Sequence, residues 1–269
     1  MSIKVDYHLH TNFSADSTEP MENMVKRAIE LRLEQICFTE HIDYDYPLDE
    51  GVIFETDLEA YFAEVDRLRG IYGAKIEILR GIELGLVPHL AERYSNLINA
   101  YHFDFIIGSS HLLDMRDPYE RSFWRDRSEE EVITRYFQSI VENIKAFSGF
   151  NVYGHLDYIV RYAPHKNEGY SYAKYATLID QVLTALIERG KGIEINTSGF
   201  LYGLNTPHPN FDIIKRYKEL GGELITVGSD AHRAADIAAF FEIIFEQLKA
   251  VGFKGYTVFN GGKAQVISF

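Results

Sequence analysis

Nine side chains of the kinds that bind metal ions follow successive apolar runs of this 269-residue chain. The runs end in the motifs HLH, TEH, GIE, SSH, GHLD and SDAH, and one further carboxylate follows the first motif in a polar loop. A lone histidine is more often a hydrogen-bonded core or surface residue, but six such endings predict one shared site. The nine are His8, His10, Asp16, His41, Glu83, His111, His155, Asp230 and His232.

The spacing and chemistry of these side chains predict a centre of three divalent metal ions. His8 and His10 are two residues apart, which places both imidazoles on one face of a strand, and Asp230 and His232 repeat that spacing. A mixture of imidazole and carboxylate suits Zn²⁺, Mn²⁺ or Fe²⁺ better than Mg²⁺ or Ca²⁺. Nine ligands are too many for one ion. About three per ion would leave open positions for water and a substrate.

The elements between these motifs alternate between strand-like and helix-like patterns. Apolar periodicity predicts helices at 20–32, from 56 to about 68, and at 88–100, 128–144, 172–189, 210–220 and 237–250. We expect Thr56 to cap the second helix, and Ser128 with Glu131 to form a capping box on the fourth. The segment KGIEINTSG predicts a further strand, and a terminal extended piece follows the last helix.

Alternation over about seven such units predicts a parallel α/β sheet with right-handed crossovers. An open sheet would gather ligands at one switch point, whereas these come from nearly every strand, so we expect a closed or distorted barrel. The ligands extend from His8 to His232, which favours one domain spanning 1–269. Two long loops, 42–55 and 112–127, follow ligand-bearing strands and should overhang the site.

Composition limits the class of partner. The chain has 27 Lys and Arg against 40 Asp and Glu, a formal net charge of -13, which disfavours extended nucleic acid and leaves a small phosphorylated substrate open. Cys37 is the only cysteine, and we expect it to be a buried, inert thiol. The sequence shows no signal-peptide pattern and no long apolar stretch, so we expect no membrane partner and a cytoplasmic location. It leaves the oligomeric state open.

The segments HLHTNFSADS, FTEH, RGIE, SSH, YGHLD and GSDAH together resemble the polymerase-and-histidinol-phosphatase (PHP) superfamily over nearly the whole chain. Within it, HLDYIVRY and INTSG are most similar to the monofunctional histidinol-phosphate phosphatases. The resemblance implies a distorted (β/α)7 TIM-like barrel, a trinuclear metal site and phosphoester hydrolysis, and all nine side chains match the ligand motifs. Asp16 departs from the pattern, because many members carry a third histidine there, and this leaves the metal preference open.

The resemblance also implies a reaction, the hydrolysis of L-histidinol phosphate to L-histidinol and phosphate in histidine biosynthesis. A hydroxide bridging two ions would be the nucleophile. Glu83 is the best candidate to bridge two cations, and Asp230, His232 or metal-bound water could protonate the leaving group. Two alternatives remain: a phosphoesterase acting on nucleotides or oligonucleotide ends, and a non-catalytic PHP module that supports a partner protein.

Arg161 is the candidate for binding the phosphate. It follows His155 by six residues, in the loop above the same strand, although a surface ion pair is the alternative. Arg80 is three residues before Glu83, so strand alternation should point it to the opposite face. The end of the INTSG strand could also bind the phosphate or leaving group, or simply form a turn, through Asn196, Thr197 and Ser198.

The two long loops contain the candidates for recognising the rest of the substrate. Asp43 or Asp45 could pair with an ammonium group, and Tyr44 or Tyr46 could pack on an imidazole, unless the segment is simply a solvated acidic loop. Two aromatic residues of the second loop could form a lid or pack on the barrel rim, and these are Phe123 and Trp124. The remaining histidines lack the strand-end pattern and should be structural or solvated, namely His89, His102, His165 and His208.

Overall fold

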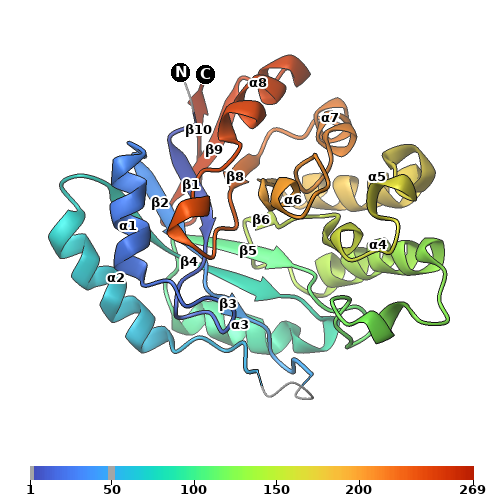
Figure 1. The fold of residues 1–269 in the computed structure, drawn as a ribbon, viewed down its shortest axis with the longest axis horizontal. Helices are drawn as coiled ribbons and strands as arrows, with labels where there is room; N and C mark the ends of the chain where they lie inside the picture. The colour runs from blue at the N-terminus through green and yellow to red at the C-terminus, as the bar shows by residue number, and fades with distance from the viewer. Residues whose placement is uncertain (1–2, 48–51) are drawn as a thin grey trace.

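A computed structural model describes residues 3–47 and 52–269 of the chain. Its centre is an eight-stranded parallel sheet in the order β1-β2-β4-β5-β6-β7-β8, with β3 paired to β4 (Figure 1). The strands are β1 (Val5–Leu9), β2 (Gln35–Phe38), β3 (His41–Ile42), β4 (Glu77–Gly85), β5 (Phe105–Ser109), β6 (Val152–Tyr153), β7 (Gly192–Asn196) and β8 (Ile225–Gly228).

The sheet curls into a barrel of seven strands. β3 continues β2 in the same register on β4, because Phe38 pairs with Arg80 and His41 pairs with Glu83. The first and last strands meet where Leu9 bridges Ala231, and the His10 N–H donates to the Ala231 carbonyl at 3.0 Å. The predicted distorted seven-stranded α/β barrel, formed by a single domain, is therefore confirmed.

Helices surround the sheet, and neighbours contact one another, α1 with α2, α4 with α5 and α7 with α8 (Figure 1). Each of the seven predicted helices buries an apolar face, as the periodicity requires, whereas the short α6 was not predicted. The α-helices are α1 (Met21–Glu30), α2 (Leu58–Tyr72), α3 (Ala91–Ala100), α4 (Glu129–Ala146), α5 (Tyr172–Glu188), α6 (Ser198–Leu201), α7 (Phe211–Glu219) and α8 (Phe241–Val251).

The predicted capping box of α4 is confirmed, but two other helix starts were wrong. The side chain of Asp57, not Thr56, accepts the capping hydrogen bond of α2, while the Thr56 hydroxyl donates to the His41 carbonyl at 2.8 Å. α8 begins at Phe241 rather than at 237, because Ala238 and Phe240 adopt positive φ angles of 55° and 64°. Those angles interrupt a right-handed helix.

The terminal extended piece forms an antiparallel hairpin of β9 (Gly255–Asn260) and β10 (Lys263–Ser268). β9 lies against the amino-terminal ends of the barrel strands. The Tyr256 hydroxyl accepts from the Lys4 N–H, and the Thr257 hydroxyl accepts from the Ile225 N–H at the start of β8. The hairpin therefore covers the end of the barrel opposite to the predicted ligands.

Cys37 lies on β2 and is fully buried, as expected for an inert thiol. In the described part of the chain, no helix has both the length and the apolar character needed to cross a membrane.

Candidate metal centre

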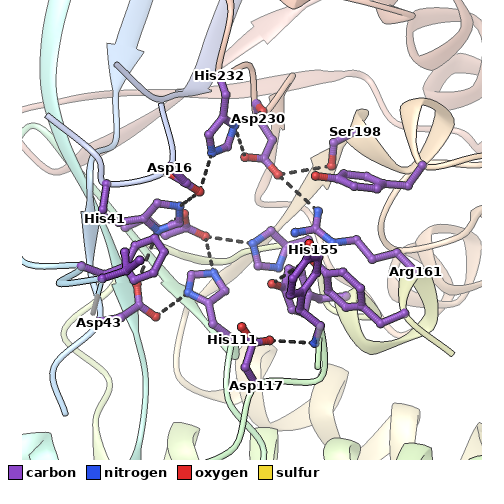
Figure 2. Close-up of a pocket in the computed structure, with 18 of the residues that line it drawn as sticks. Asp16, His41, Asp43, His111, Asp117, His155, Arg161, Ser198, Asp230 and His232 are labelled. Atoms are coloured by element: carbon purple, nitrogen blue, oxygen red, sulfur yellow. Dashed lines mark hydrogen bonds and ion pairs between the residues drawn. The ribbon is translucent and has the colours of Figure 1, made fainter. Parts of the chain in front are cut away.

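The structure brings the nine predicted ligands together at the carboxyl-terminal end of the barrel. Figure 2 labels six of them, namely Asp16, His41, His111, His155, Asp230 and His232. Each comes from a strand end or from the residues just after one, except Asp16, which lies in the loop between β1 and α1. Among the described residues, eight of the nine form groups of three donor atoms that lie within 4.8 Å of one another. The groups are His10, His41 and His232; His8, His10 and Asp230; His8, Glu83 and His155; and His41, Glu83 and His111.

The fully buried carboxylate of Glu83 is the centre of the cluster. One oxygen, Oε1, lies 2.9 Å from a nitrogen of His155 and 3.2 Å from one of His111, and it accepts from the Ser109 hydroxyl at 2.6 Å. A carboxylate offers about four acceptor positions. The other oxygen, Oε2, lies 3.1–3.4 Å from nitrogens of three further imidazoles, those of His8, His41 and His10.

Asp16 lies at the solvent side of the cluster, with its side chain 38% exposed. Its Oδ2 is 3.0 Å from Nε2 of His232 and 3.5 Å from Nε2 of His41. These distances place the carboxylate within reach of an ion shared with either imidazole.

Charges in the cluster stabilise one another strongly. Burial raises the pKa of the Glu83 carboxyl, but His8, His111 and the other imidazoles outweigh it and hold that pKa well below its usual range. Burial likewise lowers the pKa of His8, but the carboxylates of Glu194 and Glu83 raise it well above the usual value. The carboxylates therefore stay ionised and create a site that favours cations.

Local backbone geometry helps to crowd the ligands. Asp230 has a φ of 56° and His155 a φ of 20°, both uncommon for residues other than glycine and typical of functional sites. At Gly228, a Cβ atom would lie 2.4 Å from the Cβ of His8, so glycine is required where β8 meets β1.

A cavity of about 650 Å³ opens directly above the cluster. Both long loops contribute to its wall, as predicted, the first through Tyr46 and Phe54 and the second through Asp117 and Tyr119. Residues 48–51 of the first loop lie outside the described part of the chain. The size of the cavity suits a small molecule.

Comparison with known proteins identifies the family. The PHP domain model matches residues 6–198. The chain belongs to the PHP family. A histidinol-phosphatase of Lactococcus lactis is 34% identical over 261 residues, which cover 97% of this chain and 96% of the relative. A histidinol-phosphatase of Bacillus subtilis is 25% identical, covering 91% of this chain and 99% of the relative.

The crystal structure of histidinol phosphate phosphatase from Lactococcus lactis, in complex with zinc, L-histidinol and phosphate, has a TM-score of 0.91 to this PHP barrel. It is 32% identical, and the alignment covers 98% of this chain and 99% of that one. The family match ends at residue 198, before Asp230 and His232, so the domain boundary of 1–269 stays a prediction.

Arg161 of this PHP domain lines the cavity beside the predicted ligands (Figure 2). Its Nη1 lies 3.9 Å from Oδ2 of Asp230, and its Nε and Nη1 are buried without a hydrogen-bond partner. Its guanidinium carbon is 4.1–4.9 Å from the ring centres of three tyrosines, Tyr158, Tyr162 and Tyr202. Arg80 instead pairs with Asp66, outside the site, as strand alternation predicted.

The INTSG segment contributes one cavity residue. Ser198 lines the cavity, and its hydroxyl lies 3.2 Å from Oδ2 of Asp230. Asn196 is fully buried and is not part of the cavity wall. Its Oδ1 accepts from the N–H and the hydroxyl of Ser198 at 3.0 and 2.6 Å. The structure therefore places Asn196 behind Ser198, away from the cavity wall, and its role in binding a substrate stays a prediction.

The loop after β3 places one candidate of each predicted pair at the cavity. Asp43 lines the cavity, but its Oδ1 accepts from Nδ1 of His111 at 2.6 Å. Tyr44 does not line the cavity, because it stacks on Tyr94 beneath the Arg93 guanidinium. Asp45 pairs with His89 and Arg93 on the surface. Tyr46 alone of the two tyrosines reaches the cavity.

Aromatic residues of the second loop favour the rim-packing interpretation. Phe123 is fully buried and Trp124 is partly buried, and neither lines the cavity. The four other histidines are structural or solvated, as expected. His89 and His165 pair with carboxylates on the surface. His102 is exposed, and His208 is buried against Asp157.

Sequence reasoning missed one buried carboxylate of the site, Glu194 on β7. Its Oε1 lies 2.5 Å from Nδ1 of His8. The signal was present, because a charged residue between Ile193 and Ile195 must point to the opposite face from both. Glu194 lies two residues before the end of β7, as Glu83 does in β4, but the prediction for this strand considered only the polar residues after it, Asn196, Thr197 and Ser198.

Proposed function

We propose that this PHP-family protein is a metal-dependent phosphomonoesterase that hydrolyses L-histidinol phosphate to L-histidinol and phosphate. The observation that carries the proposal is the Glu83 carboxylate, whose two oxygens face separate groups of imidazoles beside the buried Arg161. The relative crystallised with zinc, L-histidinol and phosphate supports the choice of substrate, since it matches nearly the whole chain.

The residues present fit divalent ions. Five imidazole nitrogens lie within 3.4 Å of one carboxylate, which is more than its lone pairs can accept as separate hydrogen bonds. Nitrogen and carboxylate donors together suit Zn²⁺, Mn²⁺ or Fe²⁺. Three ions held by the nine predicted ligands, with Glu83 between two of them, would activate a water molecule and neutralise the charge on the phosphate.

Side chains around the cluster would bind and orient the phosphate. Arg161 offers two unpartnered N–H positions, at Nε and Nη1, and a planar guanidinium matches phosphate oxygens well. The Ser198 hydroxyl lies on the same side, close to Asp230. Asp230 and His232 border the cavity and are the candidates to hold the proton that the leaving alkoxide takes up.

Phosphate release tests the proposal directly. The purified protein is assayed with L-histidinol phosphate, a panel of simple monoesters, nucleoside monophosphates and a 5′-phosphorylated oligonucleotide, and its metal content is measured. We expect the highest kcat/KM with L-histidinol phosphate. Faster phosphate release from a nucleotide or from the oligonucleotide would show that this compound, and not L-histidinol phosphate, is the substrate. A metal-free protein without activity toward any monoester would indicate a non-catalytic module.

A further inference from the structure

Glu194 is not one of the nine predicted ligands, but it contacts two of them, His8 and His155. Its side chain is buried, with an exposure of 1%. Oε1 lies 2.5 Å from Nδ1 of His8. Oε2 accepts from the backbone N–H of His155 at 3.0 Å and from the side-chain amide of Asn196 at 3.2 Å. One carboxylate thus joins the ends of β1, β6 and β7.

The space for this carboxylate depends on glycines from two neighbouring strands. A Cβ atom at Gly228 would lie 2.6 Å from Oε1 of Glu194, which is closer than real contacts allow. A Cβ atom at Gly154 would lie 3.4 Å from Oε2 and only 2.5 Å from the Ser109 hydroxyl. The barrel interior therefore leaves the Glu194 carboxylate little freedom to move.

For His8, the contact fixes which ring nitrogen faces the cluster. An imidazole that donates its Nδ1–H to a carboxylate presents the lone pair of Nε2 on the other side. Nε2 of His8 lies 3.1 Å from Glu83 and 3.5 Å from Asp230. The orientation set by Glu194 is therefore the one that a metal ligand needs.

For His155, the contact acts through the backbone. Among the described residues, the buried Nδ1 atom of His155 has no hydrogen-bond partner, so no hydrogen bond behind the ring fixes its orientation. The residue also has an uncommon φ of 20°. The hydrogen bond from its N–H to Glu194 holds the strained backbone that carries the imidazole to 2.9 Å from Glu83.

We propose that Glu194 is a positioning residue that sets two metal ligands at once, His8 through its ring and His155 through its backbone. The inference rests on the proposed metal-dependent function. It predicts that a substitution which removes the Glu194 carboxylate weakens metal binding while the protein still folds.

The test is Glu194→Gln, which keeps the size of the side chain. His8 and His155 contact different oxygens of the carboxylate, and a carboxamide replaces one of these oxygens by an NH2 group, which donates and cannot accept. We expect zinc affinity, measured by competition with a chelator, to fall about 10–100-fold, as is typical when an outer partner of a metal ligand is lost. The visible spectrum of the cobalt-substituted protein should change, and kcat should fall with little change in KM.

Asp157→Asn is the matched control. Asp157 and His208 form a pair that is equally buried, also with a 2.5 Å separation, but His208 is not a predicted ligand. We expect this variant to melt at a lower temperature while its zinc affinity and cobalt spectrum remain those of the wild type. An equal loss of zinc affinity in both variants would overturn the inference, since any buried pair would then have the same effect.

The wild-type protein separates the two proposals. If it neither binds metal nor releases phosphate, the proposed function fails. If it does both and Glu194→Gln has wild-type zinc affinity and cobalt spectrum, only the role of Glu194 is refuted. Should Glu194→Gln not fold, Asn196→Ala removes one hydrogen bond to Oε2. Reduced zinc affinity, with an unchanged melting temperature of the chelated protein, would then support the role, and wild-type affinity would refute it.

Discussion

Arg161→Ala tests how the phosphate is bound. Burial lowers the pKa of Arg161, but the surrounding tyrosines and Asp230 outweigh that effect and keep it well above its usual value, so the guanidinium stays charged. Its side chain is 9% exposed, and the tyrosine rings hold its plane. The two unpartnered N–H positions are therefore ordered before any anion arrives.

The expected size of the effect follows from those two positions. A hydrogen bond to a charged group contributes about 1.5–3 kcal/mol, so two contribute about 3–6 kcal/mol. At about 1.36 kcal/mol per factor of ten, kcat/KM should fall about 100-fold to 10⁴-fold. We expect the lower end, because metal ions would share the phosphate. Arg161→Lys should recover only part of the loss, since an ammonium cannot reproduce the planar fork.

The assay compares kcat, KM and inhibition by inorganic phosphate in Arg161→Ala and in the control Arg80→Ala, whose guanidinium contacts Asp66 and Phe62 away from the site. A rise in KM alone would mean that Arg161 binds the substrate and the transition state equally. A fall in kcat would mean that its contact with the phosphate strengthens in the transition state. Metal content should not change. Wild-type kcat/KM and phosphate inhibition in Arg161→Ala would refute the reasoning.

Three further predictions concern the metal centre and the core beneath it. Chelation should abolish phosphate release, and added Mn²⁺, Zn²⁺ or Fe²⁺ should restore part of it; full activity of protein shown to be metal-free would contradict this. Glu83→Gln removes the charge between five imidazoles, and kcat should fall at least about 100-fold, whereas near-normal kcat with unchanged metal content would exclude a bridging role. Burial raises the pKa of Asp6 to about 6 from 3.8, so between these values the folded state holds a proton that the unfolded chain has released. The free energy of unfolding should therefore fall as the pH rises from about 4 to about 6, by up to about 3 kcal/mol. In urea titrations of the chelated protein, the free energy of unfolding of Asp6→Asn should not show this fall between about pH 4 and about pH 6. An identical pH dependence in both proteins would show that Asp6 does not cause the fall.

The convergence of the nine side chains could be predicted because a parallel barrel leaves few alternatives for where they lie. A polar residue at the end of an apolar strand points to the same edge as its neighbours, whichever loops connect them. His8 and Asp230 come together for this reason, although they lie near opposite ends of the sequence. Glu194 was missed because the polar residues at the end of its strand were considered instead, and only side-chain alternation marks Glu194 itself.

Loop residues could not be predicted in the same way. The segment after β3 has no regular period, so neighbouring side chains can point anywhere that packing allows. Tyr44 stacks on Tyr94, and Tyr46 faces the cavity, yet nothing in the sequence YDY distinguishes them. Helix starts failed for a related reason, because Asp57 and Thr56 are both good caps and only the local backbone decides between them.

The seam between β1 and β8 has a consequence for biosynthesis. Its main contacts join Leu9 and His10 to Ala231, so they cannot form until nearly the whole chain has left the ribosome. At the roughly 5–20 residues per second at which chains are synthesised, β1 waits on the order of 10–50 s for its last neighbour. During that time His8 and His10 lack their partners from the end of the chain. Metal loading of the complete set of nine predicted ligands would therefore be a late event, which follows translation rather than guiding it.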